Sequence, residues 1–310
     1  MTTDPRFAEP LARDPRSLDV WPTFLVAART WTRLAVGQFF LFAAVLVPVL
    51  ALFGLAAPGL SGAMLGATPE SIDPNELWGL GGVTLLGLTA GGLATIAAMI
   101  QADAALAGRP APGAGSALSE AVGRVPAAFA SYLLLILIVM TPYLVCFIPL
   151  LLLVPRDASG PSPGFVIGFV LSFLVAVPIL VALGTLLRFG PILAAVRERG
   201  PVASLQESFA LVRGRAWRVL GYVVLVVIAV QAAMTAAMSL AILALPVHPI
   251  AACLVYAVGS AAALPFQVVQ EVALLRRLEA MRDASAGAGP VPDATDDDTP
   301  APEPVPEPAP

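Results

Sequence analysis

The residues best suited to chemistry lie in one short run, Arg213-Gly214-Arg215-Ala216-Trp217-Arg218. Arginine forms paired hydrogen bonds with phosphate, and tryptophan favours the boundary between lipid and water. The run is therefore a candidate site for anionic phospholipid headgroups. Its candidate contacts are Arg213, Arg215, Trp217 and Arg218. The alternative is that these side chains only anchor a helix end at the membrane surface, as basic residues commonly do.

Other residues with catalytic or metal-binding capacity are isolated. The single histidine, His248, lies between two prolines, and no cysteine pair or carboxylate cluster lies near it in the sequence. A general base or a metal ligand normally needs such partners. We therefore expect no catalytic residue, no metal and no cofactor, and we expect that the protein is not an enzyme.

The elements that would carry these residues are apolar and long. Five stretches contain no Asp, Glu, Lys or Arg: 34–69, 77–102, 125–155, 158–187 and 219–270. About 20 apolar residues in a helix cross a hydrocarbon core, and the last stretch is long enough to cross it twice. The sequence therefore predicts an all-α integral membrane protein with six transmembrane helices. They are expected at about 34–57, 79–102, 127–154, 164–187, 219–244 and 250–271.

The arginines predict how these helices are oriented. Sixteen of the seventeen basic residues lie before the first span, in the second and fourth connections or after the last span, and only Arg156 lies on the other side. Basic residues collect on the cytoplasmic side of membrane proteins. Both termini are expected in the cytoplasm, in a multi-pass protein of a bacterial inner membrane, because the all-arginine basic set suggests a GC-rich bacterium.

Short amphipathic helices are expected on the cytoplasmic face of the membrane. Before the first span, aromatic residues and arginines separate onto two helix faces, which indicates a helix lying in the interface. Its predicted anchors are Trp21, Arg29, Trp31 and Arg33. In the fourth connection, Pro201 suits a helix start, and Val202, Leu205, Phe209 and Val212 form an apolar stripe. A fainter example includes Leu118 and Val125.

Polar and small residues inside the spans allow two interpretations. No ionisable side chain lies deep in a span, which argues against an ion-coupled transporter. The charged residues at the span ends are expected to reach the lipid headgroups: Asp103, Arg188, Arg218 and Glu271. Glutamines occur at 38, 101, 231, 267 and 270, where they could join helices or line a path for a neutral solute. The pairs Gly87/Gly91 and Gly164/Gly168 permit close helix packing, either within one bundle or between two copies.

The chain divides into one membrane domain and two polar ends. Residues 1–18 are polar and proline-containing, and they lack the apolar core of a cleavable signal peptide. Residues 283–310 are rich in Ala, Pro and acid, so they bury too little apolar surface to fold. We expect disordered cytoplasmic segments at 1–18 and 283–310, and a transmembrane domain at 19–282.

The run from Phe189 to Val226 resembles the membrane domain associated with bacterial glycerophosphoryl diester phosphodiesterases. In that family a span ending before a proline is followed by a Ser-rich amphipathic helix and an Arg-Gly-Arg-aromatic-Arg entry to the next span. The matching positions are Ser204, Ser208, Arg213, Gly214, Arg215, Trp217 and Arg218. The resemblance implies a polytopic membrane domain, and it does not imply hydrolysis, because the catalytic barrel of those enzymes is not in this sequence.

These features together predict a noncatalytic polytopic membrane protein that associates with phospholipid headgroups or with an envelope protein complex. The alternative is a transporter or permease-like component for a small neutral or lipid-like solute. Membrane lipids are the expected partners, with a membrane protein partner or a homo-oligomer as further candidates. A net charge of −4 and the lack of a basic soluble domain argue against nucleic acid as a partner.

Overall fold

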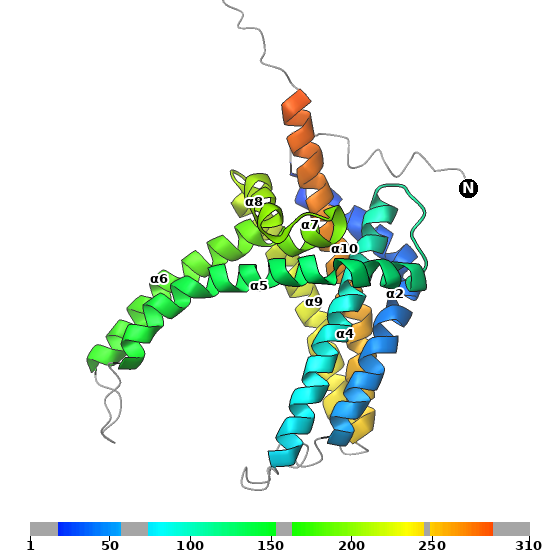
Figure 1. The fold of residues 1–310 in the computed structure, drawn as a ribbon, viewed down its shortest axis with the longest axis horizontal. Coiled ribbons are helices and arrows are strands. Elements are labelled where there is room, and N and C mark those ends of the chain that lie inside the picture. Colours follow the sequence, from blue (N-terminus) through cyan, green and yellow to red (C-terminus); the bar gives the residue numbers. More distant parts are fainter. Residues whose placement is uncertain (1–17, 57–73, 153–162, 245–248, 288–310) are drawn as a thin grey trace, which may run out of the picture.

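The computed structural model describes residues 18–56, 74–152, 163–244 and 249–287, and every element in these ranges is an α-helix (Figure 1). The helices are α2 (Val20–Ala56), α4 (Pro74–Leu106), α5 (Ala114–Leu152), α6 (Pro163–Leu187), α7 (Gly190–Arg197), α8 (Pro201–Val212), α9 (Ala216–Ala244) and α10 (Pro249–Gly287). Six helical segments are long and apolar enough to cross a membrane. The expected all-α, six-span fold is confirmed.

Four helices form the packed part of the molecule. Helices α2, α4, α9 and α10 run side by side, and α10 packs against each of the other three. The candidate span in α10 is the most buried of the six, whereas that in α6 is the least buried. Helix α10 therefore supplies the centre of the core.

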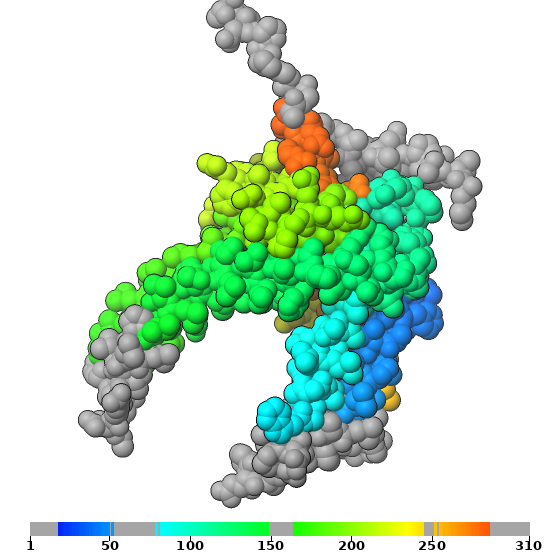
Figure 2. Space-filling model, viewed as in Figure 1, coloured from blue at the N-terminus to red at the C-terminus, as the bar shows by residue number. Residues whose placement is uncertain are grey.

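Helices α5 and α6 are arranged differently. They pack against each other as a hairpin that extends to one side of the other long helices (Figures 1 and 2). Helices α7 and α8 pack against each other and against α5, and α7 also contacts α4 while α8 contacts α6 and α10. We refer to this region as the α7–α8 end.

Proline and glycine mark the helix boundaries. Helices α4, α6, α8 and α10 each begin at a proline. Proline suits this position because the first amide groups of a helix have no partner within it. After α4 and α8 the chain turns at Gly108 and Gly214, whose φ angles are +70° and +83°. Glycine adopts this left-handed conformation without strain, so both helices can end sharply.

Several boundaries differ from those expected. The predicted interfacial segments near Trp21 and Leu118 are not separate helices, because they are the first turns of α2 and α5. Helix α7 was not predicted at all. Helix α10 continues to Gly287, so the range 283–310 begins five residues too early for a disordered tail. The remainder of that tail, and residues 1–17 of the other predicted disordered end, lie outside the described residues.

Two of the five glutamines in the spans join helices. Gln38 donates from Nε2 to the carbonyl of Ala98 on α4 at 3.3 Å, and Gln270 donates to the carbonyl of Phe24 on α2 at 3.3 Å. The hydroxyl of Tyr222 on α9 donates to Oε1 of Gln270. Of the two interpretations of these glutamines, the structure supports helix joining for Gln38 and Gln270.

The glycine pairs also differ in their surroundings. A Cβ atom on Gly87 would lie 2.8 Å from a methyl group of Val49, so this glycine permits close approach of α4 and α2. A Cβ atom on Gly164 would meet open space. Close packing inside the helix group is therefore shown for Gly87 only.

Candidate functional site

Helix α8 holds the candidate arginine run in place. Its buried residues are Ser204, Leu205, Ser208, Leu211 and Val212. Of the apolar stripe expected from the sequence, Leu205 and Val212 are buried in the protein, whereas Val202 and Phe209 are exposed. Ser204 and Ser208 also face the protein.

These serines bond α8 to its neighbours. The hydroxyls of Ser204 and of Ser131 on α5 lie 3.0 Å apart. Ser208 donates to the carbonyl of Leu186 at 2.8 Å and accepts from the backbone amide of Phe189 at 3.1 Å. Ser208 thus satisfies backbone groups at the break between α6 and α7, which would otherwise be buried without partners. Sequence reasoning assigned no role to either serine, although both lay in the segment that carried the family resemblance.

The arginine run forms the turn between α8 and α9. Arg213 and Arg215 flank Gly214, and the positive φ of that glycine reverses the chain between the two helices. Arg213 and Arg218 are exposed, Arg215 is half-buried, and Trp217 is 85% exposed. The structure therefore brings all four predicted contacts to one surface turn.

The three arginines of this turn have no protein partner within the described part of the chain. No carboxylate there forms an ion pair with Arg213, Arg215 or Arg218, and no acceptor takes a hydrogen bond from their side chains. Their guanidinium donors are free to meet water or an anion. An exposed tryptophan beside unpaired arginines is typical of a site at the level of the lipid headgroups.

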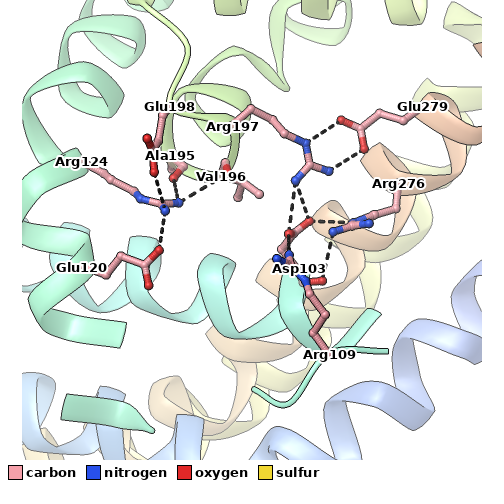
Figure 3. A network of polar contacts seen from close by, with 10 residues as sticks. All are labelled: Asp103, Arg109, Glu120, Arg124, Ala195, Val196, Arg197, Glu198, Arg276 and Glu279. Carbon is pink, nitrogen blue, oxygen red and sulfur yellow. Dashed lines mark hydrogen bonds and ion pairs between the residues drawn. The ribbon is translucent and has the colours of Figure 1, made fainter. Parts of the chain in front are cut away.

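Other arginines at the α7–α8 end are paired with carboxylates. Asp103 accepts from Nε of Arg276 at 2.7 Å, from Nη1 of Arg197 at 3.2 Å and from Nη2 of Arg109 at 3.0 Å (Figure 3). Arg197 also donates to both carboxylate oxygens of Glu279, at 3.0 and 2.6 Å. This network joins α4, α7 and α10, and we call it the Asp103 network.

The position of Asp103 corrects an expectation. At the end of a span it was expected to reach the lipid headgroups, but its side chain is 5% exposed and is surrounded by three guanidinium groups. Those positive charges favour its ionised form. Glu271 and Arg188 were expected to behave likewise, and they instead form an ion pair with each other.

A second ion-pair cluster ties α5 to the end of α7. Arg124 donates to Glu120, to Glu198 at 2.8 Å and to the carbonyl of Ala195 at 2.7 Å (Figure 3). Glu198 adopts a left-handed conformation with φ of +54°, which ends α7. Only the i, i+4 spacing of Glu120 and Arg124 was visible in the sequence. The remaining contacts join residues too far apart in the chain for any local pattern to show.

The predicted anchors on α2 have mixed surroundings. Trp21 is 60% exposed, and Arg29 and Arg33 are exposed. Trp31 is half-buried, and its ring meets Phe266 of α10 edge to face, with centroids 5.6 Å apart. Trp31 is therefore partly committed to protein packing, whereas Trp21 is placed to meet the interface.

The described residues offer no clear centre for catalysis. Among them, no group of three or more His, Cys, Asp or Glu side chains is placed to hold a metal ion. His248 lies outside the described ranges. Among the described residues, the clustered charged side chains form ion pairs, whereas Arg213, Arg215 and Arg218 lie unpaired at a surface.

Fold and site together define the class: an α-helical, multi-pass membrane protein. Comparisons with protein-family models, with curated proteins and with solved structures find no match for this chain.

Proposed function

We propose that this is a noncatalytic protein of a bacterial inner membrane that binds anionic phospholipid headgroups through the turn between α8 and α9. Both termini and the α7–α8 end face the cytoplasm. The observation that carries the proposal is the lack of any partner for Arg213, Arg215 and Arg218 among the described residues, beside the exposed Trp217.

The contrast within one end of the molecule supports this function. Arg188, Arg197 and Arg276 neutralise carboxylates and hold helices together. The turn arginines contribute no such contact, yet three positive charges close together repel one another. Anionic lipid in the adjacent leaflet would offset that repulsion, at about 1 kcal/mol for each arginine near the surface.

The test replaces Arg213, Arg215 and Arg218 by Gln in the full chain. The protein is purified from membranes in mild detergent, mixed with equal amounts of phosphatidylglycerol and phosphatidylcholine, and analysed by native mass spectrometry. We expect the preference for phosphatidylglycerol to fall at least tenfold, or about 1.4 kcal/mol. The matched control replaces the same arginines by Lys and should keep most of the preference, because the charge remains. An unchanged preference in the Gln variant would refute headgroup binding at this turn.

A transporter or permease-like role for a small neutral or lipid-like solute is the second candidate. Gln38 and Gln270 are used in helix contacts, which weakens the case for a polar path. A hollow of about 730 Å³ between α9 and α10 has an apolar lining, and this observation favours a lipid-like solute over a polar one. Uptake of a fluorescent phospholipid into the inner leaflet of proteoliposomes would test this role.

Partners beyond lipid remain part of the proposal. The α5–α6 hairpin exposes large apolar side chains such as Leu137, Phe169 and Leu174 along both helices. Lipid covers such a surface in a membrane, and an envelope protein or a second copy of the chain could cover it equally well. Membership of the membrane-domain family associated with glycerophosphoryl diester phosphodiesterases is likewise proposed from the Phe189–Val226 resemblance alone.

A further inference from the structure

An apolar groove runs along the membrane-spanning part of α9 and α10. Its volume is about 730 Å³, within the range of ligand pockets in proteins. Residues from α9 form one wall and residues from α10 the other, while Trp31 of α2 also lines it. Representative wall residues are Ala229, Ala233 and Ala236 on α9 and Val258 and Ala262 on α10.

Small side chains create the groove. Beside it the two backbones approach so closely that a Cβ atom on Gly259 would lie 2.3 Å from Cβ of Ala237. The neighbouring alanines are too small to fill the space left on the open side. All lining residues are aliphatic, aromatic or glycine, so apart from the indole N–H of Trp31 no lining side chain can hydrogen-bond a polar solute.

The groove lies on the same face of α9 as an unpaired arginine. Leu225, Ala229 and Ala236 follow Arg218 by 7, 11 and 18 residues, close to two, three and five turns of a helix with about 3.6 residues per turn. Arg218 lies about 16 Å from Ala229 along the axis, at about 1.5 Å per residue. A lipid tail passes through half of a hydrocarbon core of roughly 30 Å, and its phosphate lies above that core, so one molecule could reach from Arg218 to the end of the groove at Ala229.

We infer that one anionic glycerophospholipid binds along α9, with its phosphate at Arg215 and Arg218 and one acyl chain in the α9–α10 groove. This inference rests on the proposed headgroup site and adds a specific place for the tail. Cationic groups at the leaflet surface and an uncharged hollow in line beneath them match the two ends of such a lipid. Neither a neutral polar solute nor a soluble anion would match both the cationic surface and the apolar groove.

The first test fills the groove without changing a charge. Ala229→Phe with Ala233→Phe places two rings at the end of the groove nearer Arg218, and the matched control, Val227→Phe with Met238→Phe, adds rings to exposed positions on another face of α9. Native mass spectrometry then measures the phosphatidylglycerol retained by each full-length variant in mild detergent. We expect about a tenfold loss of retained lipid in the groove variant, equivalent to about 1.4 kcal/mol, and no loss in the control.

The second test avoids any change to the groove. Trp21, Trp78 and Trp217 are replaced by Phe, so that Trp31, which lines the groove, is the only tryptophan and can be excited selectively. Phosphatidylglycerol with brominated chains, present at one tenth of the lipid in phosphatidylcholine vesicles, should quench Trp31 more than brominated phosphatidylcholine does. Adding Arg215→Gln and Arg218→Gln should remove that difference.

The outcomes separate this inference from the proposed function. If the groove variant keeps its phosphatidylglycerol while the arginine variant loses it, the tail site is refuted and headgroup binding stands. If the arginine variant keeps its lipid, headgroup binding fails as well. If filling the groove changes only the number of chains in the complex, the groove holds a second copy and the lipid inference is overturned. Equal quenching by the two brominated lipids would also overturn it.

Discussion

Arg276 donates from Nε to Oδ1 of Asp103 across 2.7 Å, although the two residues lie 173 positions apart in the chain. This contact joins α10 to the end of α4, at the place where α7 also meets both helices through Arg197. A carboxylate that is 5% exposed and faces three guanidinium groups has little access to water. Its removal would leave Arg276 without its acid partner and Arg197 with Glu279 alone.

The Asp103→Ala variant should therefore be much less stable than the natural protein. We expect the free energy of unfolding to fall by roughly 3 kcal/mol, because breaking a buried ion pair from one side leaves charge unpaired. Unfolding of the detergent-solubilised protein by increasing sodium dodecyl sulfate measures the change. In the control, Glu120→Ala, the lost carboxylate is 42% exposed, and the cost should stay below about 1 kcal/mol. Equal losses in the two variants would contradict a structural role for the Asp103 network.

Close packing of α9 and α10 should make Gly259 sensitive to the smallest substitution. Gly259→Ala places a methyl group 2.3 Å from Cβ of Ala237, so the helices must separate, at a cost of about 1–3 kcal/mol. The same unfolding assay applies. Gly221→Ala on α9 meets open space and should be neutral or stabilising by up to about 1 kcal/mol. Adding Ala237→Gly to Gly259→Ala should recover part of the loss, and no recovery would argue against this contact as the cause.

The buried hydroxyl of Tyr222 should contribute to the joining of α9 and α10. Tyr222→Phe leaves Oε1 of Gln270 without its donor in a buried place, which should cost about 1–2 kcal/mol. Tyr132→Phe removes the hydroxyl of a tyrosine that is 54% exposed and should change little. Thermal unfolding in detergent, followed by circular dichroism, compares the two. A Tyr222→Phe variant as stable as Tyr132→Phe would show that the hydrogen bond is unimportant.

The proposed orientation can be tested with single cysteines. Cys146 and Cys253 are first replaced by Ala, and one cysteine is then introduced by Ser71→Cys or by Ala203→Cys. Ala203 is exposed on α8, and Ser71 lies between the first two spans. A membrane-impermeant maleimide added outside the inner membrane of spheroplasts should label the Ser71→Cys variant only. Labelling of the Ala203→Cys variant in intact spheroplasts would place the α7–α8 end on the outer side.

The sequence located the surface turn because its signal is local, and headgroup contact at this turn stays a prediction. Arg213, Arg215, Trp217 and Arg218 lie within six positions, and a glycine between the first two permits the turn that displays them. The role of the two α8 serines was not predicted, because Ser204 and Ser208 are buried by their hydrogen bonds to α5 and to the break between α6 and α7. A hydropathy pattern scores both residues as exposed and carries no information about such partners.

The six crossings and the one-sided distribution of arginine were determined by the sequence alone. Both depend on whether a segment is more stable in lipid or in water, and the composition of about 20 consecutive residues decides this. The tertiary structure decided which arginines remain free. Asp103 meets Arg197 and Arg276 from 94 and 173 positions away, whereas Arg213, Arg215 and Arg218 meet no acidic partner in the described chain. Charge pairing depends on distance in space, so only the packed helices could separate the arginines that stabilise the fold from those available to a lipid.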